Sequence, residues 1–77
     1  MNYDDIVDVR RMTCPMPLLK TRNKIREMAS GKILKIIGDF KPAIKNLKQF
    51  LDKEGHEILQ INDDNTEFFI LIKIIKK

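Results

Sequence analysis

Two prolines separated by one residue, Pro15 and Pro17, constrain the fold of this chain more than any other feature of its sequence. Proline has a fixed φ and no backbone N–H, so two prolines this close fit a helix only within its first turn, where the N–H groups lack helical partners anyway. We therefore predict a helix that begins at Pro15. The short β-branched run 6–9 precedes it and is typical of a strand that ends at Arg10 and Arg11.

Hydrophobic spacing predicts two helices. The first ends at Ser30 and Gly31, and one of its sides carries Leu18, Thr21, Ile25, Met28 and Ala29. Pro42 fits the first turn of the second helix, with Asp39 as a candidate cap and Gly55 as its end. The buried stripe of this second helix is predicted to be Ile44, Leu47, Phe50 and Leu51.

Three more segments have the composition of strands. The run 33–37 is apolar on both sides and is predicted to be central in the sheet, while 56–61 and 66–75 flank the polar turn 62–65. In the order β-α-β-α-β-β the first two strands are parallel and the last two form an antiparallel hairpin. We therefore predict an α+β fold, a two-layer α/β sandwich with a mixed four-stranded sheet and two helices on one face, as a single domain over residues 1–77.

Length and composition exclude several classes of function. A chain of 77 residues is too short to bury a deep active-site cavity. The acidic N-terminal stretch is unlike a signal peptide and no apolar run is long enough to span a bilayer, so we expect a soluble cytoplasmic protein without a membrane partner. With one cysteine and one histidine, the chain has neither a disulfide framework nor the ligand spacing of a zinc site. We expect no metal and no other cofactor.

Cys14 is the candidate reactive residue. The following proline disfavours the α region, so we expect Cys14 to be extended at the N-cap, with its sulfur facing free N–H groups. The helix dipole, helped by Arg10 and Arg11, then favours the thiolate and suits the charged terminal sulfur of a persulfide. Without a second cysteine, that sulfur can leave only to another molecule. A free cysteine is most often a small buried hydrophobe, but a corner framed by prolines beside charges is a poor place for one.

A basic segment surrounds this cysteine in the sequence. Six cationic residues and no acidic ones lie between positions 10 and 26, namely Arg10, Arg11, Lys20, Arg22, Lys24 and Arg26. We predict that Lys20 and Lys24 lie on the outer face of the first helix and Arg22 and Arg26 on its flank, where all four ring the sulfur end and dock an acidic partner surface. An ordinary solvated helix face is the alternative.

These features together resemble the TusA/SirA-like sulfur carrier protein family over almost the whole chain. The resemblance rests on Asp8-Val9-Arg10, Cys14-Pro15-Met16-Pro17, Gly31 before a strand, Asp39 before a helix, and Gly55-His56 opening a strand. It implies the two-layer sandwich and a persulfide on Cys14, with Pro15 and Pro17 framing the corner and not the core. The family usually has a glycine three residues before the cysteine, where this chain has Arg11.

The resemblance also implies two kinds of protein partner. One is a cysteine desulfurase or another sulfur donor, and the other is a downstream sulfur acceptor, with tRNA thiolation as one of the routes. Such a protein is a sulfurtransferase only in the sense that it must be reloaded after each transfer.

Two other functions and one further residue remain open. A small basic RNA-binding module agrees with the isoelectric point of about 9.4, but a base-stacking surface needs exposed aromatic residues and the chain has only four phenylalanines and one tyrosine. We therefore do not expect direct nucleic-acid binding. A regulatory interaction domain would leave the Cys-Pro-x-Pro motif unexplained. His56 could act as a base near Cys14, although a local hydrogen bond at the start of its strand is the simpler expectation.

Overall fold

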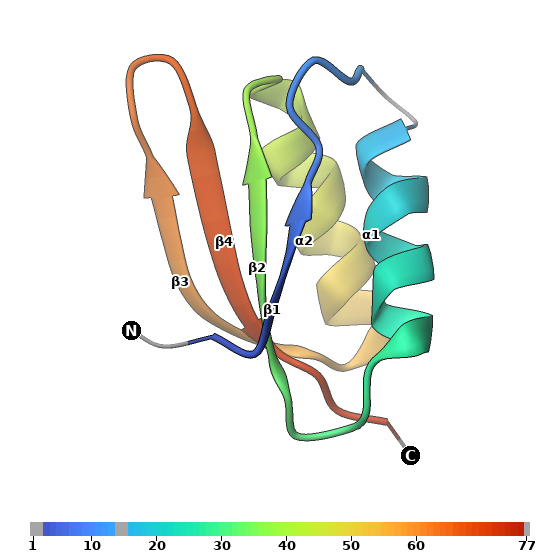
Figure 1. The fold of residues 1–77 in the computed structure, drawn as a ribbon. Coiled ribbons are helices and arrows are strands. Elements are labelled where there is room, and N and C mark those ends of the chain that lie inside the picture. Colours follow the sequence, from blue (N-terminus) through green and yellow to red (C-terminus); the bar gives the residue numbers. More distant parts are fainter. Residues whose placement is uncertain (1–2, 14–15, 77) are drawn as a thin grey trace.

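The computed structural model describes residues 3–13 and 16–76, which form two helices and four strands in the predicted order (Figure 1). The elements are β1 (Asp5–Asp8), α1 (Met16–Glu27), β2 (Ile33–Gly38), α2 (Pro42–Glu54), β3 (Glu57–Asp63) and β4 (Phe68–Lys73). Both helices lie on one face of the sheet (Figure 1), so the predicted α+β sandwich is confirmed. The strand ends differ from the predicted ones by one or two residues. Pro15, the predicted first residue of the helix, lies outside the described residues.

The strand order β1-β2-β4-β3 places β2 and β4 in the centre of the sheet. β1 is parallel to β2 and the hairpin of β3 and β4 is antiparallel, as the sequence predicts. β4 also pairs with β2, in the antiparallel direction. The pairing of β3 with β4 shifts between Ile58 and Gln60, so Leu59 is an extra residue that forms a β-bulge.

The hydrophobic core lies between the sheet and the inner sides of the helices. Alternate residues of β2 and β4 point into it and are fully or almost fully buried, namely Leu34, Ile36, Phe68, Ile70 and Ile72. The helices contribute Ile25, Ala43, Leu47 and Leu51. Leu18, Ile44 and Phe50 pack against this core but stay partly exposed, so the buried stripe of α2 is rotated slightly from the predicted one.

Three local predictions about the helices are wrong. Pro17 is fully buried, so it belongs to the core as well as to the corner. Ala29 is exposed, because α1 ends at Glu27 and Ala29 lies in the loop that follows. Asp39 does not cap α2: the N-cap residue is Lys41, which makes no side-chain capping bond. At the other end Gly55 ends α2 as predicted, in the left-handed conformation with φ 83°.

Gly38 ends β2 at a point where a side chain would not fit. A Cβ atom placed on it would lie 2.6 Å from Cζ of Phe68 and 3.0 Å from Cγ2 of Val9. Phe68 is the residue that pairs with Gly38 across the two central strands. The glycine therefore makes room for the phenylalanine ring in the core.

We expect Gly38→Ala to lower the free energy of unfolding by about 1–3 kcal/mol, because the ring of Phe68 and the side chain of Val9 must both shift. Urea denaturation measures this loss. In a Phe68→Leu background the loss should be smaller, since leucine leaves room for the new methyl group. An equal loss in both backgrounds would show that the ring is not the group that Gly38 accommodates.

Candidate functional site

Cys14 and Pro15 lie outside the described residues, so the site is built from the residues that flank them. The Met16 N–H donates a hydrogen bond of 2.9 Å to the Thr13 carbonyl oxygen, which joins the two sides of this segment. α1 begins at Met16 and has no acidic residue in its first turn. No carboxylate of the described part of α1 therefore neutralises the positive end of the helix dipole.

The backbone that leads to Cys14 is held by Asp39. The Arg11 N–H donates to both carboxylate oxygens of Asp39, at 3.0 and 3.1 Å. Arg11 has φ 65°, and it is the one non-glycine residue with positive φ in the described ranges. A glycine would adopt this conformation without steric cost, whereas arginine has a Cβ atom that disfavours it. Asp39 follows β2 directly, so it ties this segment to the central strand.

Two carboxylates orient Arg10. Its guanidinium donates to Oδ2 of Asp8 at 2.8 Å and to Oε2 of Glu67 at 3.4 Å, and its Nε and backbone N–H both donate to Oδ1 of Asp8. The guanidinium bond is the main reason that the pKa of Asp8 falls from 3.8 to about 2, and the same contacts raise the pKa of Arg10. All three side chains are close to half exposed, so these ion pairs orient Arg10 more than they stabilise the fold.

The cleft beside Arg10 and Arg11 has no net charge. Its volume is about 660 Å³, and it is lined by Asp8, Arg10, Arg11, Met12, Lys20, Asp39 and Glu67. Three cations therefore face three carboxylates. The basic segment is therefore balanced at this cleft, because β1, the loop after β2 and the loop before β4 bring Asp8, Asp39 and Glu67 to it from distant parts of the sequence.

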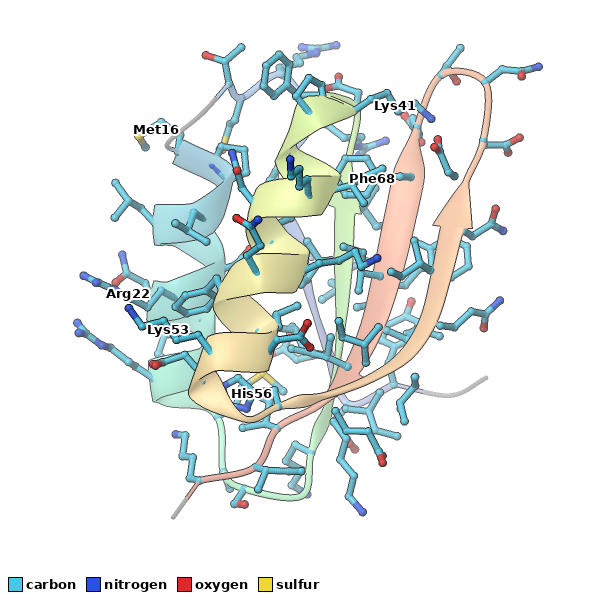
Figure 2. The ribbon with its side chains drawn as sticks, turned by 180° about the vertical axis from the view of Figure 1, so that it is seen from behind. Met16, Arg22, Lys41, Lys53, His56 and Phe68 are labelled. Atoms are coloured by element: carbon cyan, nitrogen blue, oxygen red, sulfur yellow. The ribbon has the colours of Figure 1, made fainter. Side chains whose placement is uncertain are left out.

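The four predicted docking residues do not form one ring. Lys20 lines the cleft beside Arg10. Lys24 instead forms an ion pair of 2.8 Å with Asp5 on the edge strand β1, and this bond raises the pKa of Lys24. Only 26 % of the Lys24 side chain is exposed, so the prediction that it points outward is wrong. Arg22 and Arg26 line a separate groove between α1, α2 and the C-terminal segment (Figure 2).

His56 lies at the end of the molecule away from the start of α1. Figure 2 shows His56 beside the C-terminal end of α2, whereas Met16 lies at the opposite end of the helix pair. The Nδ1 atom of His56 accepts a hydrogen bond of 3.0 Å from the Ile75 N–H, so its partner lies 19 residues further along the chain, whereas the predicted local bond required a partner close to it in the sequence. Burial lowers the pKa of His56, and the charge of Glu54 opposes this effect. His56 is therefore not placed to act as a base at the start of α1.

Some charged side chains of the described ranges form ion pairs, among them Arg10 with Asp8 and Lys24 with Asp5. No three or more His, Cys, Asp and Glu side chains in these ranges are grouped so that they could hold a metal ion. Neither α1 nor α2 has the length and apolarity needed to cross a bilayer.

We expect Arg11→Gly to leave the free energy of unfolding within about 1 kcal/mol of the wild type, because relief of the left-handed conformation offsets the greater freedom of glycine in the unfolded chain. Arg11→Val should lower the free energy by about 1–2 kcal/mol, since a β-branched residue fits this conformation poorly. Urea denaturation of both variants tests this. Equal stability of the two would mean that φ at this position carries no cost.

We expect the wild type to lose stability as the pH falls below 6.5, the ordinary pKa of histidine, and a His56→Gln variant to lose less. The folded-state pKa of His56 is lowered, so between that pKa and 6.5 the unfolded chain binds more protons than the folded chain. The stability that the neutral His56 contributes is therefore fully present above pH 6.5, and it is lost as the pH falls toward the folded-state pKa. The carboxylates with lowered pKa values, Asp5 and Asp8, lose their effect only below about pH 4. Identical urea-unfolding profiles of the two chains between pH 7 and 5 would contradict this account.

Comparison with known proteins shows which family this chain resembles. The sequence model described as Sulfurtransferase TusA matches residues 5–74. A candidate sulfur carrier protein of Methanocaldococcus jannaschii is 36 % identical over 67 residues, which cover 87 % of this chain and 89 % of that protein. The sulfur carrier protein TusA of Buchnera aphidicola is 33 % identical over 63 residues, which cover 82 % and 80 %.

A solved structure has the same fold as this chain. The crystal structure of a SirA-like protein from Desulfitobacterium hafniense has a TM-score of 0.80 at 18 % identity, and the match covers 95 % of this chain and all of that one. Its two-layer fold is therefore the fold described above. With the family match running from the first strand to the end of the last, the chain belongs to the sulfurtransferase TusA family.

Proposed function

We propose that this protein is a sulfur carrier, which accepts sulfur as a persulfide on Cys14 and passes it to another protein. The observation that carries this proposal is the family match over residues 5–74, within which Cys14 is the only cysteine of the chain. The relatives from Methanocaldococcus jannaschii and Buchnera aphidicola are both named as sulfur carriers. A thiol is the one side chain that can hold a sulfane sulfur in this way.

The proposed reaction consists of two exchanges of one sulfur atom. The Cys14 thiolate attacks the terminal sulfur of a persulfide on the donor, so a new S–S bond forms on Cys14 while the donor's S–S bond breaks and leaves a thiolate there. A nucleophile of the acceptor then attacks the terminal sulfur on Cys14 and returns Cys14 to the thiolate. The chain undergoes no net oxidation, and it has no second cysteine that could divert the sulfur into an internal disulfide.

The surroundings of Cys14 support this reaction. The bonds from Arg11 to Asp39 hold the segment before the cysteine, and the buried ring of Pro17 anchors the first turn of α1 after it. We propose that Pro15 shares this framing role. The first turn of α1, without acidic residues, provides a favourable field for a thiolate or a persulfide anion.

The proposed partners are proteins on both sides of the transfer. A cysteine desulfurase or another sulfur donor loads Cys14, and a downstream acceptor unloads it, with tRNA thiolation as one candidate route. We propose that Arg10, Arg11 and Lys20 meet these partners at the sulfur end, where the cleft presents charges of both signs. Partner surfaces with mixed charges fit such a cleft better than uniformly acidic ones.

Direct RNA binding on the open face of the sheet has less support. The ammonium group of Lys35 lies 5.2 Å from the centre of the Tyr3 ring and 4.7 Å from that of Phe69. Both rings are therefore already occupied by a cation–π contact with the same lysine. A base would have to displace Lys35 before it could stack on them.

The proposal is tested by loading the protein with sulfur. The chain is incubated with cysteine and a cysteine desulfurase, and in parallel with glutathione persulfide, and its intact mass is measured. We expect the wild type and a Thr13→Ser control to gain one sulfur atom that a reducing agent removes, and Cys14→Ser to gain none. Equal loading of Cys14→Ser, or a folded wild type that takes sulfur from neither source, would contradict the proposal.

A further inference from the structure

A basic groove lies on the side of the helix pair where Arg22 and Lys53 project (Figure 2). Its volume is about 780 Å³, and α1, the C-terminal half of α2 and the C-terminal segment form its walls. Four cations and one carboxylate line it, namely Arg22, Arg26, Lys53, Lys76 and Glu54. The groove therefore has a charge of +3, compared with +4 for the whole chain and zero for the cleft at the sulfur end.

Three of these cations are available to a ligand. Arg22 and Arg26 are one turn apart on the same side of α1, and Lys53 faces them from the last turn of α2. None of the three forms an ion pair with another residue of the described ranges. Arginine binds carboxylates in a bidentate manner, so this pair suits a ligand with spaced carboxylates.

The floor and one wall of the groove are apolar. Ile25 is buried at its base, the ring of Phe50 is partly exposed between the helices, and 41 % of Ile75 is exposed beside them. A ligand that carried only charge would leave the surfaces of Phe50 and Ile75 in water. Burying them requires a ligand with an apolar side chain next to its negative charges.

The wall formed by the C-terminal segment is fixed before any ligand arrives. The Ile74 N–H donates to the Lys32 carbonyl oxygen, the Gly31 N–H donates to the Ile74 carbonyl oxygen, and His56 accepts the bond from Ile75. Lys76 donates to the Met28 carbonyl oxygen at the C-terminal end of α1. Because these bonds already order Ile75, a ligand that packs on it causes only a small further loss of conformational entropy in this wall.

We propose that this groove docks an acidic amphipathic segment of a partner protein. Carboxylates of that segment pair with Arg22, Arg26 and Lys53, and an apolar side chain packs on Phe50 and Ile75. The inference deepens the proposed function and rests on it for the identity of the partner, because a sulfur carrier must be held while its sulfur is transferred. Arg26 lies ten residues after Met16, or about 15 Å along α1, so the partner grips the carrier at a distance from the sulfur end.

The test uses a synthetic twelve-residue peptide of glutamates with leucine at every third or fourth position, together with the full chain. Amide shifts in ¹⁵N NMR spectra locate the peptide, and fluorescence anisotropy gives its Kd. We expect shifts at the groove residues and a loss of affinity of about tenfold or more in the Arg22→Glu, Arg26→Glu double variant. The matched control, Lys45→Glu with Lys48→Glu, makes the same charge change on exposed residues of α2 outside the groove and should change the Kd less than about threefold.

Two further ligands test whether the groove prefers an acidic peptide with apolar side chains to a purely polar peptide or to RNA. A peptide in which serine replaces each leucine should bind markedly more weakly, and Ile75→Ser should weaken the leucine peptide but not the serine peptide. A single-stranded RNA of twelve nucleotides is titrated under the same conditions. If the RNA binds the groove residues more tightly than the leucine peptide, or if the control variant loses as much affinity as the groove variant, the inference is wrong.

The mass measurement on the wild type separates this inference from the proposed function. A chain that takes up sulfur on Cys14 but binds no peptide in the groove contradicts the docking inference alone. A chain that binds the peptide but takes up no sulfur contradicts the carrier function alone.

Discussion

The contact between the Arg11 N–H and the Asp39 carboxylate is the interaction on which the geometry of the sulfur end depends. Asp39 directly follows β2, which has a paired neighbour on both sides and packs its inner side chains in the core. The segment that includes Arg11 is therefore held in position by a central strand of the sheet. Arg11 has an unfavourable positive φ where it makes this contact. A strained backbone conformation of this kind persists only where the surrounding structure stabilises it.

Charge in this protein is organised by the fold and not by the order of residues. The acid-free run 10–26 is basic in the sequence, but Asp8 and Glu67 hold Arg10, and Asp5 holds Lys24. Pairing is thus concentrated at the sulfur end and along the edge of β1. Three cations without an ion pair in the described ranges, Arg22, Arg26 and Lys53, lie together in the groove between the helices, because the two helices bring basic residues together there without an equal number of carboxylates.

Much of the fold could be predicted from the sequence, because its signals are local. Proline and glycine mark the helix ends, and the run 33–37 identifies a central strand by its apolar residues. The site was less predictable. Asp39 before a helix indicates a cap, and nothing local shows that Arg11, 28 residues earlier, competes for its carboxylate. The burial of Pro17 and the pairing of Lys24 likewise depend on which face of α1 meets the sheet, which only the packed structure decides.

The bulge at Leu59 also affects how the protein behaves in crowded solution. β3 is an edge strand, and an edge with regular, unpaired backbone groups is a template on which a second chain can add a strand. The bulge interrupts that regularity, and the polar side chains of Glu57, Gln60 and Asn62 line the same edge. The opposite edge, β1, offers only four residues and carries Asp5 and Asp8. Both borders of the sheet are therefore poor seeds for aggregation, even at high protein concentration.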